Sequence, residues 1–489
     1  MHVHVSFGAM TSSTQDERWG ARLWGVLTVL CAVVFLDALD VSMVGVALPS
    51  IQADLGMSTS SLQWVVSGYV LGYGGLLLLG GRTADLLGRR RVFLIALAVF
   101  AVASLLGGLM SDGTLLIAAR FVKGVSAAFT APAALSVITT TFAEGPARNR
   151  ALSIFTACGA SGFSLGLVLS GLLTEIGWRW TFFMPVPVAI IALVAGTRLL
   201  QRSEERGEGG HDLLGAATIT AAMLLLVFAV VEAPKVSVVR TVLSLAGAAA
   251  LIGLFVWLER RVRHPLVRLG ILRSAPLARA NFGLVILFGS YVGFQFVAMQ
   301  YFQNLLGWSA LETALAFLPS GLLVAISSTK MGGFADRFGT ARLIVVGSVA
   351  LLAGYAVFLR VDLHPSLLTM VLPGMVLLGI AFALSFPSLN IQATAGVSDE
   401  EQGLASGLLN TSGQVGGAVV LAIVTAVLTS GAGGGDPIVR FRAAIVVSAG
   451  FALVGLAVAL TGLRPGRRSA RRSGRRPVEA REETVLEVV

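Results

Sequence analysis

Charge is scarce in this sequence: Asp, Glu, Lys and Arg make up only 13% of its 489 residues. A soluble globular protein has about 25% of such residues, so the composition excludes a water-soluble domain. Hydrophobic residues reach 55%, and the mean hydropathy is +0.84. The sequence therefore predicts an integral membrane protein.

Cysteine and the signatures of catalysis are also scarce. The two cysteines, Cys31 and Cys158, lie in apolar stretches and form no disulfide framework. The sequence has no zinc signature, no phosphate-binding Walker loop and no nucleophile elbow. We therefore expect no metal, no cofactor and no enzyme activity. Residues 1–20 lack the apolar core of a signal peptide, so the first apolar segment is expected to remain as a helix.

Long apolar segments are what the sequence does have. A membrane span needs about 20 apolar residues, and fourteen segments qualify within a few residues. They cover residues 23–47, 62–84, 92–110, 114–142, 151–173, 180–200, 212–232, 240–258, 281–302, 312–331, 342–360, 367–389, 403–428 and 441–462. The predicted fold class is an all-α integral membrane protein with 14 transmembrane helices.

Lys and Arg are unevenly divided between the predicted loops. If the N-terminus is cytoplasmic, the opposite side carries only Arg179, Lys235, Arg240, Arg360, Arg440 and Arg442. Cytoplasmic loops are enriched in Lys and Arg, so both termini are predicted to be cytoplasmic. The net charge of +10 then follows from topology and requires no nucleic-acid partner. The basic tail, residues 463–489, is either a topology determinant or a site for anionic lipid, at about 1 kcal/mol per basic residue.

Two loops repeat one pattern. The stretch "GRTADLLGRRR" begins at Gly81, and "GGFADRFGTAR" begins at Gly332. Aligning Asp85 with Asp336 also aligns Gly88 with Gly339, which indicates two six-helix pseudo-symmetric halves. The predicted organisation is a cytoplasmic N-terminal segment, a first half, two inserted helices with their loops, a second half and the basic tail, at residues 1–22, 23–200, 201–280, 281–462 and 463–489.

Several motifs, in order along the chain, resemble those of the major facilitator superfamily, and specifically its fourteen-helix drug:proton antiporter branch. Residues 81–91 are similar to the loop motif G-x-x-x-D-x-x-G-R-[KR], and "DVSMVGVALP" at 40–49 is similar to the first-helix motif D-x-T-x-x-N-V-A-L-P. "RFVKGVSAA" at 120–128 resembles the fourth-helix motif R-x-x-Q-G, and "WRWTFFMPVP" at 178–187 follows helix five as in the family. "GFSLGLVLSG" at 162–171 keeps the spaced glycines of the antiporter motif.

The resemblance implies proton-coupled export of small amphipathic organic compounds, such as an antibiotic, by alternating access between the two halves. The partners would be the small-molecule substrate, protons and membrane lipids, in a bacterial cell membrane. Alternatives are an uptake symporter or uniporter on the same fold, or a non-transporting receptor or lipid-handling protein. Lys123 stands where the family usually has Gln, which favours an anionic or zwitterionic substrate, and Gly45 stands where it often has Asn.

Four charges lie inside predicted spans. Asp37 and Asp40 are in the first, and Arg120 and Lys123 are in the fourth. Asp40 and Arg120 are each about 12 to 13 Å from the outer end of their helix at 1.5 Å per residue. Each pair is spaced i, i+3 and shares one helix face. In the fold that the resemblance implies, helices one and four both line the central cavity of the first half, which would bring the two acids and the two bases together. The resemblance favours Asp40 as the proton-coupling residue, with Asp37 as an additional acid; the alternative is a fixed structural ion cluster.

The repeated loops and one acidic loop are expected to form a cytoplasmic gate. The acidic loop joins helices twelve and thirteen. The topology that the resemblance implies places the basic run after helix two near this loop, so the acids would pair with that run when the cavity opens outward. The alternative is that they only favour a helix N-terminus. The residues assigned to this gate are Gly81, Asp85, Gly88, Arg89, Arg90, Asp336, Gly339, Asp399, Glu400 and Glu401.

The substrate cavity is predicted from aromatic and polar side chains inside spans. On helix nine these side chains recur at helical spacing, although such a stripe also suits helix packing. The candidates on helix nine are Tyr291, Gln295 and Met299. Asn410 and Gln414 are polar candidates inside helix thirteen, where interhelical hydrogen bonding is the alternative. Trp64 and Tyr69 on helix two are added because they match a pattern of the family near the outer cavity.

Overall fold

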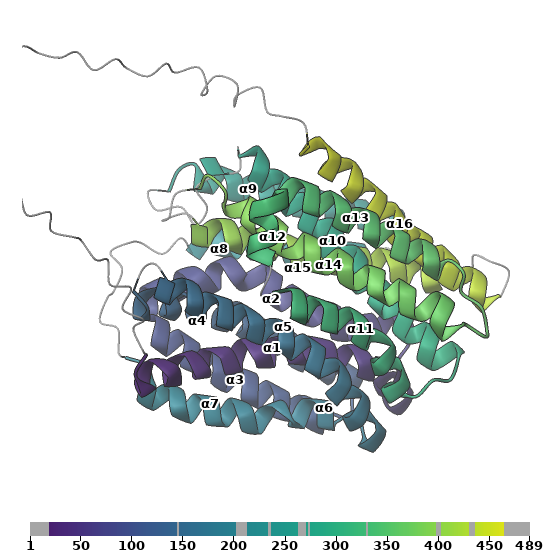
Figure 1. Ribbon diagram of the computed structural model, residues 1–489, viewed down its shortest axis with the longest axis horizontal. Helices are drawn as coiled ribbons and strands as arrows, with labels where there is room; N and C mark the ends of the chain where they lie inside the picture. Colours follow the sequence, from purple (N-terminus) through teal and green to yellow (C-terminus); the bar gives the residue numbers. More distant parts are fainter. Residues whose placement is uncertain are drawn as a thin grey trace, which may run out of the picture.

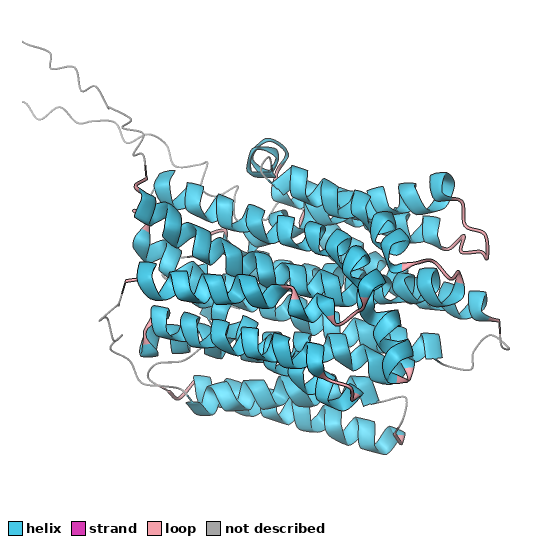
Figure 2. Ribbon diagram, turned by 90° about the horizontal axis from the view of Figure 1, so that it is seen from below, coloured by secondary structure: helices cyan, strands magenta, loops and turns pink. Residues whose placement is uncertain are grey.

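The computed structural model describes residues 19–143, 146–201, 213–232, 236–262, 270–271, 274–328, 331–397, 402–429 and 436–463. Every regular element in these ranges is a helix. The long helices run side by side, as the two views in Figures 1 and 2 show. The expectation of an all-helical fold is therefore confirmed for the described part of the chain.

The first group of helices is made from the N-terminal part of the chain. It comprises α1 (Ala21–Leu55), α2 (Thr59–Leu87), α3 (Arg89–Leu109), α4 (Gly113–Thr141), α5 (Pro146–Ile176), the single turn α6 (Trp180–Phe183) and α7 (Pro185–Leu199). Local chemistry sets several of these ends. The Asp112 carboxylate accepts from two backbone N–H groups at the start of α4. Gly88, at φ 92°, turns the chain between α2 and α3.

The second group is made from the C-terminal part. It comprises α10 (Ala275–Met299), which continues as the π-helix η2 (Gln300–Leu305), then α11 (Ala310–Ser328), α12 (Met331–Phe338), α13 (Thr340–Phe358), η3 (Leu367–Val371) with α14 (Leu372–Thr394), α15 (Gln402–Thr429) and α16 (Pro437–Thr461). Between the two groups in the sequence lie α8 (Leu213–Glu232) and α9 (Val238–Glu259), which contact each other. The α8 helix also contacts α2 and α15, one from each group.

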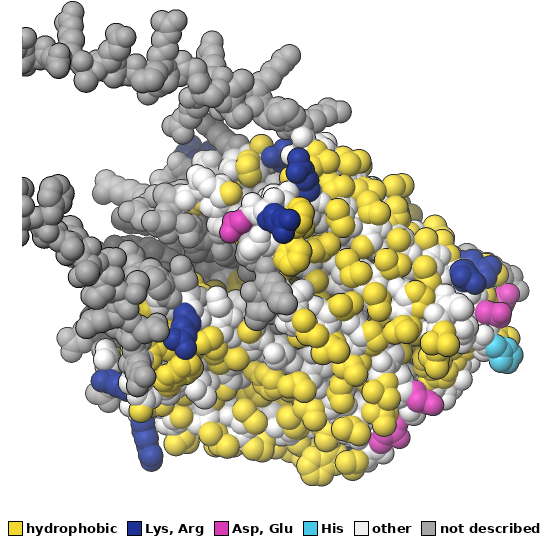
Figure 3. Space-filling view, viewed as in Figure 1, with side chains coloured by type: hydrophobic (Ala, Val, Ile, Leu, Met, Phe, Trp, Pro, Cys, Tyr) yellow, Lys and Arg dark blue, Asp and Glu magenta, His cyan; other side chains and the backbone are white. Residues whose placement is uncertain are grey.

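The length and polarity of the helices suit a membrane. Among the described residues, twelve helices are long and apolar enough to cross one. The segments α2 and α8 are helical as predicted but are not among these twelve, so the count of fourteen stays a prediction. Figure 3 shows a broad apolar face along the helices, with charged side chains near the ends. Side chains such as Ile191 and Leu368 are 68% and 77% exposed on such faces, as lipid contact requires.

The two ends of the bundle are distinguished by the chain termini. The helix α1 begins and α16 ends at the same end of the bundle, at the left in Figure 1, which we name the terminal end. The opposite end, where α1 leads into α2 and α10 leads into α11, is named the far end. Two predicted boundaries differ there: α1 continues past residue 47 to Leu55, and α10 continues through η2 to Leu305.

Candidate functional site

A buried ion cluster joins α1 and α4. The two carboxylate oxygens of Asp40 accept from different cations, Oδ2 from Arg120 Nη1 and Oδ1 from Lys123 Nζ. Asp40 and Lys123 are 0% exposed and Arg120 is 2% exposed. Isolated charges at such depth are strongly unfavourable, so the two cations and the anion stabilise one another. The partner on helix four that the sequence predicts for Asp40 is the one that the structure provides.

Arg120 also connects α4 to α2. Its Nε donates to the carbonyl oxygen of Val65 at 3.0 Å. Its guanidinium carbon lies 4.6 Å from the centre of the Tyr69 ring, within the range of a cation–π contact. Tyr69, predicted as a cavity residue, thus lies directly beside the ion cluster.

Lys123 connects α4 to α3 and to the turn before α7. Its Nζ donates to the Ser104 hydroxyl at 3.0 Å, and that hydroxyl donates to the carbonyl oxygen of Phe182 at 2.7 Å. The same ammonium lies 4.7 Å from the Phe100 ring centre and 5.2 Å from that of Phe182. Sequence reasoning missed Ser104, because one serine in an apolar helix carries no sign of its partner.

Asp37 does not join this cluster. It is half-buried, and its Oδ2 accepts from the Thr130 hydroxyl on α4 at 3.2 Å. Among the described residues it forms no ion pair, so three of the four charges expected together are in contact. The reason is helical rise: Asp37 lies three residues before Asp40, about 4.5 Å nearer the terminal end, where α4 presents Thr130 instead of a base.

Glycines allow the neighbouring helices to approach the cluster closely. A Cβ atom on Gly166 of α5 would lie 2.8 Å from the Leu39 carbonyl oxygen, and one on Gly162 would lie 3.0 Å from the Phe35 Cα. Both glycines belong to the spaced set in residues 162–171, and both face α1 on either side of Asp37. The close approach expected from that motif is therefore present at the helix that carries both aspartates.

Side-chain amides connect the two groups of helices near the far end. Gln52 Oε1 of α1 accepts from Gln300 Nε2 at 3.3 Å and from Asn304 Nδ2 at 3.1 Å. Gln303 Nε2 donates to the Val46 carbonyl oxygen at 2.9 Å. We name Gln52, Gln300 and Asn304 the amide cluster. Sequence reasoning did not select it, although the polar run "QYFQN" at 300–304 was a visible signal.

Two of the predicted cavity residues, Gln295 and Gln414, contact the first group of helices across the boundary between the two groups. Gln295 faces Gly45 of α1, where an added Cβ would lie 3.6 Å from its Nε2, and Gln414 packs against Gly74 of α2. The other predicted cavity residues have different neighbours. Tyr291 contacts Phe382, Trp64 contacts Phe228, and the Asn410 amide donates to the Ser406 carbonyl oxygen of its own helix. Met299 is fully buried.

The predicted gate is only partly within the described residues. Gly88 and Gly339 both have positive φ, 92° and 79°, so the repeated loops turn alike. Arg90 donates to the Thr197 carbonyl oxygen at 2.6 Å, and Asp336 is exposed. The side chain of Asp85 and the acidic loop with Asp399, Glu400 and Glu401 lie outside the described residues, so their pairing stays a prediction.

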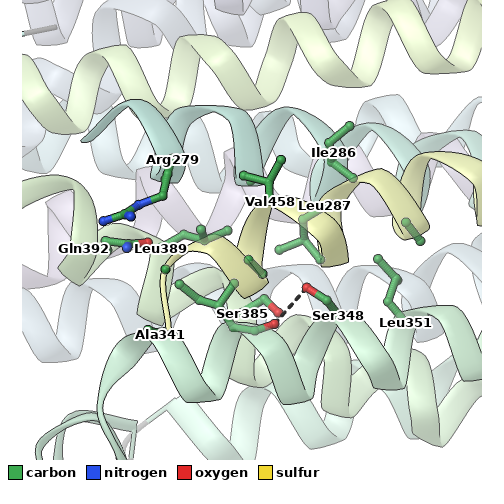
Figure 4. Close-up of a pocket in the computed structure, with 16 residues that line it drawn as sticks. Arg279, Ile286, Leu287, Ala341, Ser348, Leu351, Ser385, Leu389, Gln392 and Val458 are labelled. Carbon is green, nitrogen blue, oxygen red and sulfur yellow. Dashed lines mark hydrogen bonds between the residues drawn. The ribbon is translucent and has the colours of Figure 1, made fainter. Parts of the chain in front are cut away.

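A narrow cavity lies within the second group, among α10, α13, α14 and α16 (Figure 4). Arg279 and Gln392 lie next to each other at one end of it. Its volume of about 30 Å³ suits ordered water but not an organic substrate. A larger apolar groove of about 530 Å³ between α3 and α4 is lined by side chains such as Val99 and Val102, which are exposed on the lipid-facing side.

Apolar helices that expose hydrophobic side chains around a buried ion cluster are typical of a multi-pass membrane protein. Residues 30–421 and 331–487 match the sequence profile of the Major Facilitator Superfamily. The chain belongs to that family, which confirms the resemblance seen in its motifs.

Known proteins similar to this chain include antibiotic resistance proteins. The puromycin resistance protein of Streptomyces alboniger is 38% identical over 423 residues, which cover 83% of this chain and 82% of that protein. The lincomycin resistance protein of Streptomyces lincolnensis is 34% identical over 472 residues, which cover 95% and 96%. The fold is similar to that of the xylose transporter XylE from E. coli, with a TM-score of 0.63 and 12% identity, covering 91% of this chain and 98% of that one.

Proposed function

We propose that this protein is a proton-coupled exporter of small amphipathic organic compounds, antibiotics among them. The observation that carries the proposal is the fully buried cluster of Asp40, Arg120 and Lys123, with Asp37 one turn away on the same helix. Ionisable groups in a membrane interior are rare and mark ion or proton pathways. The puromycin and lincomycin resistance proteins, similar over most of their length, support export as the direction.

Transport would proceed by alternating access between the first and second groups of helices. We assign both termini to the cytoplasm of a bacterial cell from the distribution of Lys and Arg, and we assign 14 spans in total from the apolar segments of the sequence. The far end is then extracellular, and the amide cluster holds it closed. The contact between Ser164 of α5 and the carbonyl oxygen of Gly321 of α11, at 2.8 Å, connects the same two groups. Opening outward requires these contacts to separate.

The substrate would bind between the two groups, where Gln295 lies opposite Gly45. The Gln295 side chain is 9% exposed, and its Nε2 has no hydrogen-bond partner in the described part of the chain. An unpaired buried donor is unfavourable, so a substrate acceptor at this position would be stabilised. Tyr291 and Phe382 supply aromatic surface on the same side. This combination suits a molecule that is largely apolar with a few hydrogen-bond acceptors.

The test is transport in inverted membrane vesicles from cells that express the protein. Puromycin, lincomycin and the dye ethidium are offered with an imposed pH gradient, and then with an ionophore that dissipates it. Accumulation that depends on the gradient is the expected result. Accumulation that the ionophore leaves unchanged would indicate a uniporter, and gradient-driven loss of preloaded compound would indicate an uptake symporter.

A further inference from the structure

The two aspartates of α1 have different surroundings. Each oxygen of Asp40 is bound to its own cation, one to Arg120 and one to Lys123. Protonation of Asp40 would place a hydrogen on an oxygen that already faces a cation, and would leave two cations buried without an anion. Such a state is unfavourable at 0% exposure. The geometry therefore opposes proton uptake at Asp40.

Asp37 is in a position where both protonation states are satisfied. Its partner, the Thr130 hydroxyl, has two acceptors within reach, Asp37 Oδ2 at 3.2 Å and the Ala127 carbonyl oxygen at 3.3 Å. A hydroxyl has one proton to donate. When Asp37 is ionised the hydroxyl can donate to it. When Asp37 is protonated, its carboxyl O–H can donate to the Thr130 hydroxyl oxygen while that hydroxyl donates to the Ala127 carbonyl oxygen, so the Thr130 hydroxyl is paired in both states.

Asp37 is also the more accessible acid. It is half-buried whereas Asp40 is fully buried. The titratable groups that face it are Tyr69 and Tyr73 of α2, Lys123 of α4 and Asp40 of its own helix. With Asp37 ionised, the two acids balance Arg120 and Lys123. With Asp37 protonated, Asp37, Asp40, Arg120 and Lys123 together carry one net positive charge.

We propose that Asp37 is the acid that carries the transported proton, and that Asp40 remains ionised as the fixed counter-ion of Arg120 and Lys123. This inference rests on the proposed function, because it names the coupling residue of the same transporter. Asp37 takes a proton from the extracellular side when the far end is open. It releases that proton to the cytoplasm when the substrate loads, and the Thr130 hydroxyl then donates to the carboxylate.

Two variants separate the aspartates. Asp37→Asn keeps the shape and a partner for Thr130 but cannot lose a proton. Asp40→Asn alone leaves two cations unpaired and is expected to fold poorly, so the matched variant is Asp40→Asn combined with Lys123→Gln. That double variant removes one charge of each sign and leaves the net charge around Asp37 unchanged.

The first measurement needs no substrate. Infrared difference spectra of the purified full-length protein between acid and alkaline pH record every titrating carboxyl group. Asp37→Asn should lose one component, from a carboxyl shielded from bulk water, and the double variant should retain it. Retention of that component in Asp37→Asn, or its loss only in the double variant, would overturn the proposal.

The second measurement uses ethidium and puromycin in inverted vesicles. Asp37→Asn should lose gradient-driven accumulation completely but keep exchange of labelled for unlabelled compound without a gradient. The double variant alters the ion cluster and is expected to transport more slowly, but the accumulation that it retains should still disappear when the ionophore dissipates the gradient. The opposite pattern would assign coupling to Asp40 and overturn the proposal. If the wild-type protein transports neither probe while the infrared component disappears in Asp37→Asn, export of these compounds fails and the assignment of the titrating acid stands.

Discussion

The ion cluster makes a quantitative prediction about stability. Asp40→Asn removes the anion that both Arg120 and Lys123 contact. Both cations are at most 2% exposed, so water cannot replace the carboxylate. Removal of one partner from a buried ion pair costs about 3 to 5 kcal/mol. We expect Asp40→Asn to destabilise the folded protein by about that amount.

The cost should depend on charge balance and not on the shape of residue 40. Lys123→Gln alone leaves Asp40 paired with Arg120 and leaves a side-chain amide near Ser104. It should cost about 1 to 3 kcal/mol, the penalty for loss of a buried hydrogen-bond partner. Asp40→Asn together with Lys123→Gln should be more stable than Asp40→Asn alone, because a single buried cation remains instead of two.

The assay is the apparent melting temperature of the purified protein in detergent, measured by the loss of its monodisperse chromatographic peak on heating. The expected order is wild type, Lys123→Gln, the double variant and, least stable, Asp40→Asn. The four proteins also form a double-mutant cycle, which isolates the coupling between residues 40 and 123. Independent, additive effects of the two substitutions would refute the argument that charge balance stabilises the cluster.

Three further predictions concern helix contacts. Gln52→Ala removes an acceptor for two amide donors and should destabilise the closed far end by about 0.5 to 1.5 kcal/mol per hydrogen bond. Pulsed electron resonance between labels at the far ends of α1 and α11 should therefore show longer distances. An unchanged distance distribution would contradict this prediction. Gly124→Ala places a Cβ 2.9 Å from the Tyr69 Cα and should lower the stability of the folded protein by about 1 to 3 kcal/mol. Its matched control, Gly75→Ala, has open space around the added Cβ and should leave the melting temperature unchanged. The same melting temperature for both variants would disprove the prediction. Reversal of the three acids at 399–401 to Lys should favour the inward-open state, read from labels at the terminal ends of α2 and α15, and the absence of a shift would leave those acids as helix caps.

The sequence by itself determined the class of the protein. Apolar segments of about 20 residues form helices in a membrane whatever lies beside them, because the backbone must satisfy its hydrogen bonds within each segment. The motifs at 40–49, 81–91 and 120–128 identified the family, and the four charges inside spans marked the site. The partner of Asp40 followed from two sources: the matching depths on two helices, which depend on the rise per residue, and the family resemblance, which implies that helices one and four line one cavity.

Tertiary structure alone decided how these groups are connected. Which side chains meet depends on the distance and rotation between helices whose contacting residues are far apart in the chain, 80 positions for Asp40 and Arg120. One turn of α1 was enough to give Asp37 a hydroxyl partner where the sequence predicted a base. The partners of Ser104 and of the amide-cluster residues could not be derived from the sequence for the same reason: a polar residue in an apolar helix shows that a partner is needed, and only the packing of helices determines which residue supplies it.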